Sequence, residues 1–162
     1  MNTHSQNMDW VQRADLSAQH WPQAALYVVA TPIGNLADIT LRALWVLSHA
    51  DAIAAEDTRV AQQLLSRYGM AQPPQGWIRA HTHAEREAGE HICALLARGA
   101  RVALVSDAGT PALSDPGARV VQAVREAGFV VQPIAGPSSA LAALSVAGFC
   151  SSDFTFLGFL PT

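Results

Sequence analysis

The segment at residues 107–117 (DAGTPALSDPG) is rich in groups that bind small polar ligands. Its polar side chains are Asp107, Thr110, Ser114 and Asp115. Gly109 permits positive φ or close approach of a ligand to bare backbone. Pro111 stiffens the segment, and Pro116 is well placed as the first helical residue behind Asp115. Because most connections between elements take about 2–6 residues, so long a turn indicates a binding loop.

A second group of chemically capable residues is Glu56-Asp57-Thr58-Arg59, directly after an apolar run. Glu56 could orient or deprotonate a hydroxyl, and Arg59 could hold a phosphate bidentately. The alternative is structural: Asp57 or Thr58 caps the next helix and Arg59 is a solvated surface charge. Both interpretations are open from the sequence.

The third group is His81-Thr82-His83-Ala84-Glu85. We expect no metal site, because no third ligand is spaced to join His81 and His83. His83 is a candidate proton carrier, since the ordinary pKa of histidine is about 6.5. Thr82 and Glu85 have the spacing of a capping box at the start of a helix.

Two further segments resemble ligand-binding turns. In TPIGNL, Pro32 and Gly34 follow an apolar run, either as a simple turn or as a ligand contact. In AGPSSA, Gly136 and Pro137 precede a helix whose first turn holds Ser138. The backbone N–H groups at a helix start are free to bind polar ligand atoms, although capping alone also explains the serines.

Composition excludes several classes of function. The 162 residues include ten Arg and no Lys, so mechanisms that need an amine are excluded. The net charge of −3 provides no broad basic field for nucleic acid. The dinucleotide fingerprint G-x-G-x-x-G is absent, and two distant cysteines indicate neither a disulfide framework nor a zinc site. Carboxylates, hydroxyls and bare backbone favour a small ligand with a positive centre.

The elements that must position these groups alternate between strands and helices. Apolar runs predict six strands, at residues 26–31, 52–55, 77–80, 101–106, 129–134 and 154–160. Five helices lie between them, the first capped by Asp38, and a short helix is expected within residues 9–20. This alternation predicts one three-layer α/β domain with a mainly parallel sheet. The loops after the strands should then meet at one edge, where open α/β sheets bind ligands.

No apolar run approaches the roughly 20 residues of a membrane span, and residues 1–23 lack the pattern of a secretory signal. We therefore expect a soluble cytoplasmic protein without membrane contact.

With these loops collected, the sequence resembles the tetrapyrrole methylase (class III) family of S-adenosylmethionine-dependent methyltransferases. The resemblance rests on LYVVATPIGNLADITLRAL, AAEDTR, VALVSDAGTPALSDPG, PIAGPSSALAALSVAGF and FLGFLP, in that order. It covers residues 26–161, and within the family it points to the enzymes that methylate small-subunit ribosomal RNA. The resemblance implies 2'-O-methylation of a ribose of a decoding-site cytidine in 16S rRNA.

It further implies S-adenosyl-L-methionine as cofactor, held in a cleft between two α/β domains. Residues 1–24 would be a polar extension that can be disordered, and residues 25–162 the N-terminal domain, inactive or weakly active without the C-terminal domain. The implied partners are small-subunit rRNA or the assembled small ribosomal subunit, and a second copy in a homodimer.

By position, the resemblance assigns the cofactor side to Pro32, Gly34, Asp107, Gly109, Thr110, Pro111, Asp115, Gly136, Pro137 and Ser138. It assigns the polar cleft to Glu56, Asp57, Arg59, His83 and Glu85. From these we take Glu56, Arg59 and His83 as catalytic candidates, with Glu56 or His83 as the base. The family usually has Asn where Ala84 stands, so no hydrogen-bond role is expected there.

Two alternatives remain open. One is a precorrin-type methyltransferase acting on a tetrapyrrole ring. The other, for the domain alone, is a non-catalytic module for dimerisation or metabolite binding. Since RNA affinity comes mainly from cations on phosphates, a domain of charge −3 needs further basic surface from elsewhere to bind RNA.

Overall fold

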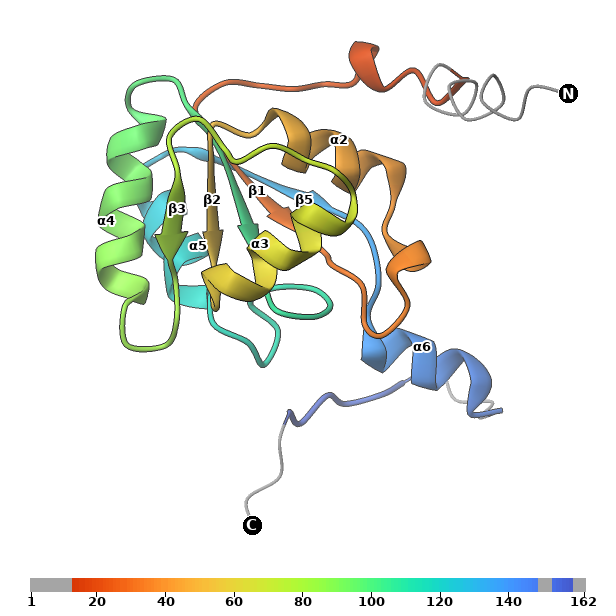
Figure 1. Cartoon of the computed structure of the whole chain (residues 1–162). Helices are drawn as coiled ribbons and strands as arrows, with labels where there is room; N and C mark the ends of the chain where they lie inside the picture. Colours follow the sequence, from red (N-terminus) through yellow and green to blue (C-terminus); the bar gives the residue numbers. More distant parts are fainter. Residues whose placement is uncertain (1–12, 149–152, 159–162) are drawn as a thin grey trace, which may run out of the picture.

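The computed structural model describes residues 13–148 and 153–158. Five parallel strands form one sheet in the order β3-β2-β4-β1-β5 (Figure 1). They are β1 (Ala25–Val29), β2 (Ala52–Ala55), β3 (Trp77–Arg79), β4 (Arg101–Val105) and β5 (Val130–Ile134). The predicted α/β class and parallel sheet are confirmed, with strand ends within two residues of expectation.

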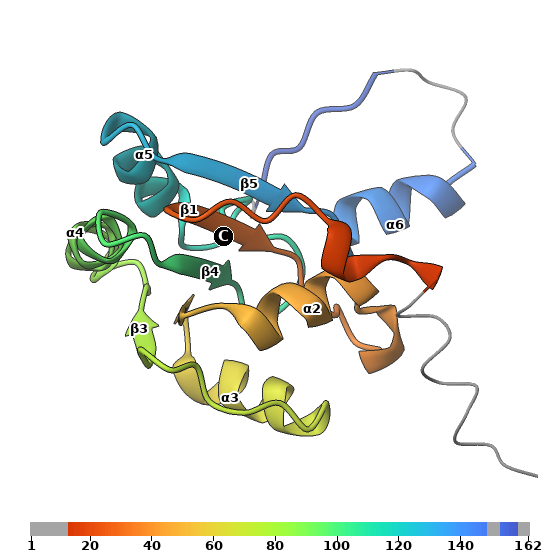
Figure 2. The same ribbon diagram turned by 90° about the horizontal axis from the view of Figure 1, so that it is seen from above.

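Helices cover both faces of the sheet, which gives three layers (Figure 2). They are α2 (Leu41–His49) and α3 (Thr58–Arg67) on one face, and α4 (Glu85–Leu96) and α5 (Ala118–Glu126) on the other. Because successive strand residues point to opposite faces, β1 contributes to two cores. Tyr27 and Val29 pack with α2 and α3, whereas Leu26 packs with α4 and α5.

The last helix, α6 (Ser139–Val146), projects from the sheet and buries none of its residues (Figures 1 and 2). The sixth strand expected at residues 154–160 is a wrong prediction over its described part, since residues 153–158 form no strand. Residues 159 and 160 lie outside the described residues. An apolar run becomes a strand only where a neighbouring edge pairs with it. Here Phe154 and Phe156 lie instead against the loops that follow β4 and β5.

Three helix starts differ from the sequence expectation. Thr40, not Asp38, caps α2, and its hydroxyl accepts from the backbone N–H of Ala43 at 3.1 Å. Asp38 lies instead in a 3₁₀ turn, Leu36–Asp38. Helix α5 begins two residues after Pro116. The capping box is also wrong: α4 has Ala84 at its N-cap with no side-chain cap bond.

The chain before β1 packs onto the sheet at residues that the structure describes. Of the short helix expected within residues 9–20, residues 9–12 lie outside the described part, and Leu16–Ala18 is a 3₁₀ turn. The Trp21 ring packs against the Tyr27 ring at an angle of 37°, and the Tyr27 hydroxyl donates to the Pro22 carbonyl at 2.7 Å. Among the described residues, no helix has the length and apolar character needed to cross a membrane.

Candidate active site

The five strands end at one edge of the sheet, and the loop after β4 (residues 107–117, the β4 loop) connects the loops found there. It pairs with the loop that follows β1 (the β1 loop) through Thr31 and Gly109. The Thr31 N–H donates to the Gly109 carbonyl at 2.9 Å, and the Gly109 N–H donates to the Thr31 carbonyl at 3.1 Å. It reaches the β2 loop through Asp107, whose Oδ1 accepts from the N–H of Asp57 at 3.2 Å.

The β4 loop also bonds to the remaining two loops. The Thr110 hydroxyl donates to the Pro137 carbonyl after β5 at 3.1 Å. The Gly117 N–H donates to the Glu85 carboxylate, from the segment after β3, at 2.6 Å. The predicted convergence of five loops is therefore present, with the β4 loop bonded to each of the others.

Two glycines in these loops lie in close contact with a neighbouring loop. Gly109 has φ +81°, and a Cβ there would lie 3.3 Å from Cγ2 of Ile33. A Cβ at Gly136 would lie 2.9 Å from the Cβ of Ala30, closer than side chains approach. Of the two uses of Gly109 expected from the sequence, positive φ or close approach of a ligand, the structure shows the positive φ, whereas at Gly136 the contact between loops demands glycine.

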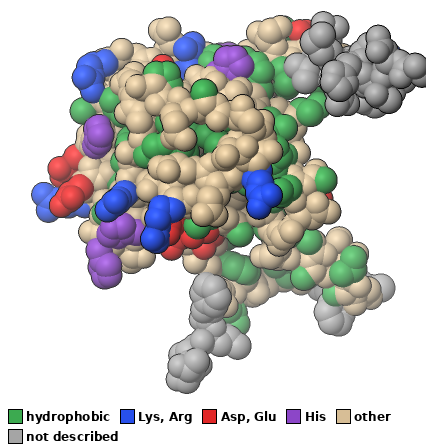
Figure 3. Space-filling model, viewed as in Figure 1, with side chains coloured by type: hydrophobic (Ala, Val, Ile, Leu, Met, Phe, Trp, Pro, Cys, Tyr) green, Lys and Arg blue, Asp and Glu red, His purple; other side chains and the backbone are tan. Residues whose placement is uncertain are grey.

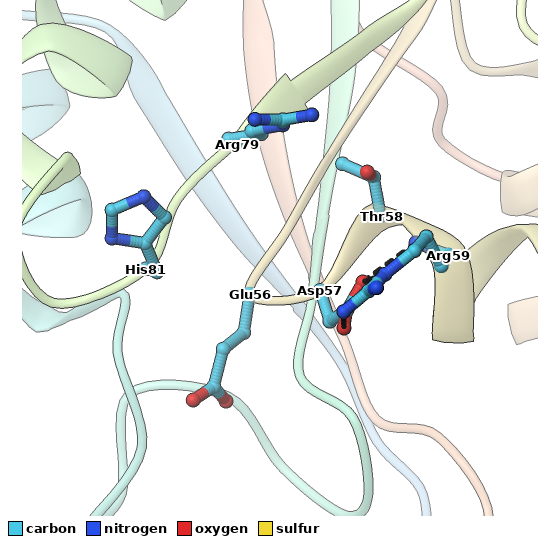
Figure 4. Close-up of a pocket in the computed structure, with 6 residues that line it drawn as sticks. All are labelled: Glu56, Asp57, Thr58, Arg59, Arg79 and His81. Atoms are coloured by element: carbon cyan, nitrogen blue, oxygen red, sulfur yellow. Dashed lines mark hydrogen bonds and ion pairs between the residues drawn. The ribbon is translucent and has the colours of Figure 1, made fainter.

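The first hollow at this edge has a volume of about 360 Å³ (Figure 4). It is lined by Glu56, Asp57, Thr58, Arg59, Arg79 and His81. Figure 4 shows Arg79 and His81 on the β3 side, Thr58 and Arg59 on the α3 side, and Glu56 between them. The Glu56 side chain begins between these two walls, and its carboxylate extends away from Arg79 and Thr58 (Figure 4).

Asp57 and Arg59 form a bidentate pair at the rim of this hollow. Nε and Nη2 of Arg59 donate to the two carboxylate oxygens at 3.0 and 2.7 Å. Asp57 also caps α3 by accepting from the Arg59 N–H, as the structural alternative expected. These hydrogen bonds lower the pKa of Asp57 to about 2, so it is ionised throughout the physiological range.

Three carboxylates, which we call the acidic cluster, link the loops after β2 and β4: Glu56, Asp107 and Asp115. Burial raises the pKa of Glu56, and the negative charges of Asp107, Asp115 and Asp57 raise it further, against a smaller opposite effect of His81. Burial and Asp107 likewise raise the pKa of Asp115. Carboxylates that repel one another in this way take up protons more readily than exposed ones.

A second hollow of about 420 Å³ lies between the loops after β4 and β5. Its lining is Thr110, Leu113, Ala135, Gly136, Ser138, Ala140, Leu141, Phe154 and Phe156. A smaller hollow shares Thr110, Leu113, Ser138, Ala140 and Phe156 with it and adds Ala108, Gly109, Asp115 and Ser139. The walls of the larger hollow are mostly apolar, and the two hollows together have three hydroxyls and one carboxylate, which is typical of a small-molecule site.

The structure divides the predicted cofactor residues into two groups. Those that line the second hollow or its smaller neighbour are Gly109, Thr110, Asp115, Gly136 and Ser138. Asp107 and Pro137 act in the hydrogen bonds between loops. Pro32, Gly34 and Pro111 line neither hollow; Gly34 has φ +146° and open space at its Cβ position.

Sequence reasoning missed Arg79 and weighed His81 only as half of a metal pair. Arg79 is the last residue of β3 and His81 follows two residues later, so the carboxyl-edge rule alone would have selected both. His83 does not line the first hollow, and its ring lies 6.3 Å from that of His81. Its role as a proton carrier stays a prediction. Over residues 13–148 and 153–158, no three His, Cys, Asp or Glu side chains are grouped to hold a metal ion.

Charged side chains are present at the carboxyl edge of the sheet, and also along the upper and left margins of the face that Figure 3 shows. Figure 3 shows basic, acidic and histidine side chains along the lower margin, where Figure 1 places the arrowheads of β2, β3 and β4. This margin is therefore a mixed-charge surface at the carboxyl edge of the sheet, suited to a ligand that has both polar and anionic groups.

Comparison with known proteins agrees with this architecture. Among curated proteins, the chain is 59% identical over 137 residues to ribosomal RNA small subunit methyltransferase I of Neisseria meningitidis (serogroup A), covering 84% of this chain and 46% of that protein. It is 50% identical over 139 residues to the protein of the same name from Escherichia coli O157:H7, covering 86% and 48%. The chain spans about half the length of these relatives.

Two solved structures share the fold. Uroporphyrin-III-C-methyltransferase from Thermus thermophilus superposes with a TM-score of 0.57 at 24% identity, covering 76% of this chain and 52% of that one. The cobalamin biosynthetic enzyme cobalt precorrin-4 methyltransferase gives 0.60 at 21% identity, covering 80% and 54%. The profile of the Tetrapyrrole (Corrin/Porphyrin) Methylases matches residues 25–159. The chain therefore belongs to the tetrapyrrole methylase family, whose members use S-adenosylmethionine.

Proposed function

We propose that this chain forms the N-terminal half of an S-adenosylmethionine-dependent methyltransferase that methylates the 2'-hydroxyl of a cytidine ribose in 16S rRNA. The observation that carries the proposal is the presence of two unlike hollows at the carboxyl edge of the sheet, with an acidic cluster whose Glu56 lines the first hollow and whose Asp115 lines the smaller neighbour of the second. One hollow suits a small apolar and polar ligand, and the other suits a hydroxyl beside an anion. The printed names of the relatives support rRNA as the substrate.

The second hollow fits S-adenosylmethionine in size and chemistry. Leu113, Phe154 and Phe156 provide apolar walls for a nucleoside, and Thr110 and Ser138 provide hydroxyls. Asp115, at the adjoining smaller hollow, provides a negative charge for a ligand with a positive centre. When bound, the cofactor supplies an electrophilic methyl group on its sulfonium. These residues would hold that ligand between the loops that follow β4 and β5.

Glu56 is the candidate general base. Its carboxylate lies in the first hollow, and burial together with neighbouring negative charges raises its pKa. A raised pKa makes the carboxylate a stronger base than an exposed glutamate, which suits removal of a proton from a ribose hydroxyl. In this proposal, Glu56 accepts the 2'-hydroxyl proton while the walls of the hollow orient the ribose.

Arg59 and Arg79 are candidates for the RNA phosphate next to that ribose. Nε and Nη2 of Arg59 already donate to Asp57, which leaves three of its five N–H groups, along the edge formed by Nη1 and Nη2, for the bidentate phosphate contact expected from sequence. Arg79 lines the opposite wall and can supply a second cation. The remaining donors of both side chains would fix the phosphate and thus the ribose.

The surface of α6 supports a homodimer of the full-length protein. Leu141 is 59% exposed and Val146 is 84% exposed, on a helix without charged residues. Exposed apolar residues on an uncharged helix favour an interface with another protein surface. Sedimentation velocity should give a dimer mass for the full gene product; a monomer at micromolar concentration would contradict this part of the proposal.

The test of the function is a labelling experiment. The full gene product that carries this sequence is incubated with methyl-labelled S-adenosylmethionine and small ribosomal subunits that lack the modification. We expect label on the 2'-oxygen of one cytidine in 16S rRNA, mapped by nuclease digestion and mass spectrometry. In a parallel incubation with a precorrin in place of the ribosomal subunits, label on the precorrin would favour the tetrapyrrole alternative, which rests on structures that share only the fold. Saturable cofactor binding without transfer to either substrate would favour a binding module.

A further inference from the structure

Glu85 is a buried carboxylate that the proposed chemistry does not use. Only 7% of its surface is exposed, and it stands at the first position of α4. Its Oε1 accepts from the Gly117 N–H at 2.6 Å and from the Arg119 N–H at 3.3 Å. Both donors belong to the start of α5, thirty or more residues further along the chain, so Glu85 caps a helix other than its own.

Helix α5 depends on this cap. Its N-cap residue, Gly117, has φ +124° and no side chain, so no group of its own accepts from the first turn. The first N–H groups of a helix have no partner within the helix, and a buried one without an acceptor is destabilised. Glu85 supplies the missing acceptor as a carboxylate, and hydrogen bonds to an ionised acceptor are stronger than neutral ones.

The same bond closes the carboxyl end of the β4 loop. At the other end, the Ser106 hydroxyl donates to the Gly109 carbonyl at 3.2 Å, and Thr31 pairs with Gly109. Between these anchors, Ala112 and Ser114 adopt φ of +66° and +64°, a region that non-glycine residues seldom occupy. A loop with such backbone angles persists only when its surroundings hold both ends.

We propose that Glu85 is a positioning residue: by capping α5 it holds the β4 loop in the shape that places Thr110 at the second hollow and Asp115 at its smaller neighbour. Its consequence for cofactor affinity rests on the proposed function, whereas its effect on the loop does not. Glu85 thereby connects the segment that carries His81 and His83 to the loop that lines the cofactor hollow.

The test compares Glu85→Ala, Glu85→Gln and the control Glu87→Ala in the 162-residue chain. Glu87 also lies in the first turn of α4, so its charge interacts with the helix dipole as the charge of Glu85 does. Glu87 is exposed, however, and does not make the contact that Glu85 makes with α5. Amide hydrogen exchange is followed at Gly117, Arg119 and residues 107–116. Binding of S-adenosylhomocysteine is followed by calorimetry.

In Glu85→Ala we expect exchange of these amides to accelerate at least about tenfold, and the dissociation constant for S-adenosylhomocysteine to rise by about tenfold or more. Glu85→Gln retains a neutral acceptor, so its values should lie between those of wild type and Glu85→Ala; this variant carries the test if the alanine variant does not fold. Glu87→Ala should match wild type.

Unchanged exchange in residues 107–119 of both Glu85 variants would overturn the positioning role. Equal acceleration throughout the molecule, without a larger effect at the β4 loop, would also overturn it by showing a purely global contribution to stability. If wild-type protein does not bind S-adenosylhomocysteine, the cofactor part of the proposed function fails, and the exchange measurement still decides the role of Glu85.

Discussion

The two ends of the sheet are built from different kinds of residues. Toward the amino ends of β1 and β4, the tilted rings of Trp21 and Tyr27 pack with 4.1 Å between their centroids, and the Arg101 guanidinium lies 5.3 Å from the Trp21 ring centroid. Hydrogen bonds are present there too: Arg101 donates from its backbone N–H to the Asp51 carboxylate at 2.7 Å and from Nη2 to the Trp21 carbonyl at 3.2 Å. At the carboxyl ends lie the buried polar side chains of Thr31, Glu85 and Ser106. The amino end therefore combines aromatic packing with hydrogen bonds, whereas the carboxyl end is held by hydrogen bonds between loops.

The difference separates stability from chemistry. Aromatic rings stabilise through buried area, which carries little directional chemistry. Buried polar groups have to be satisfied by partners and therefore fix particular geometries. The carboxyl end can consequently hold carboxylates with raised pKa, such as Glu56, on loops whose shape is specified. Substitutions at the two ends should then have separable effects.

The largest expected effect is on turnover at the carboxyl end. Glu56→Gln should lower the single-turnover rate of rRNA methylation by about 10²–10⁴-fold, because a general base is removed. Cofactor affinity should stay within about twofold, since Glu56 does not line the second hollow. Folding disfavours the charged form of a group whose pKa it raises, so the thermal midpoint at neutral pH should not fall. Turnover at the wild-type rate would show that Glu56 is not the base.

Next comes a loss of stability at the amino end. Tyr27 is fully buried, and Tyr27→Ala should lower the free energy of unfolding by roughly 3–5 kcal/mol, measured by urea denaturation. Tyr27→Phe removes only the bond to the Pro22 carbonyl and should cost about 1 kcal/mol. Where the variants remain folded, the affinity for S-adenosylhomocysteine should be unchanged. A matching loss of affinity would contradict the separation of the two ends.

A smaller effect on stability and cofactor affinity is expected at Gly136, which both packs against a neighbouring loop and lines the second hollow. In Gly136→Ala, the new Cβ would lie 2.9 Å from the Cβ of Ala30, so the β1 and β5 loops must move apart. Overpacking of this kind costs about 1–3 kcal/mol, and here it should also weaken cofactor binding because Gly136 lines the second hollow. Gly128→Ala is a control, since its positive φ of +82° strains the backbone but no atom lies within 4 Å of its Cβ position. If affinity falls equally in both, local packing at Gly136 is not the cause.

The smallest expected effect concerns the Asp57–Arg59 pair. Arg59→Gln removes the side-chain hydrogen bonds that most lower the pKa of Asp57 but keeps the bond from the backbone N–H of residue 59, so this pKa should rise from about 2 part of the way toward the ordinary 3.8. Because the folded pKa lies below the unfolded one, the pair stabilises the fold above pH 3.8, and this contribution is lost as the pH falls through about 2. Carboxyl carbon chemical shifts in an NMR titration measure the change. An Asp57 pKa that stays near 2 in the variant would show that a group other than the Arg59 side chain stabilises the ionised Asp57 carboxylate.

Much of the fold was predictable because the relevant signals are local. Val28 and Leu104 lie in short apolar runs bounded by turn residues, and such runs identify buried parallel strands. The expected strand at residues 154–160 shows the limit of that signal, because strand formation over Phe154 and Phe156 needs a paired edge that the described structure does not provide. The composition of a segment shows which secondary structures it can form, and the elements packed beside it in the fold determine which one it adopts.

For the candidate site, the amino-acid sequence by itself determined which residues have the chemistry: the carboxylates of Glu56 and Asp115, the hydroxyls of Thr110 and Ser138, and the guanidinium of Arg59. Only the tertiary structure decided their partners. Glu85 resembled a cap for its own helix but accepts from Gly117, and Gly136 is required by contact with Ala30. The physical reason is that hydrogen bonds and steric contacts join atoms that are close in space, and sheet topology sets that proximity for residues far apart in the chain.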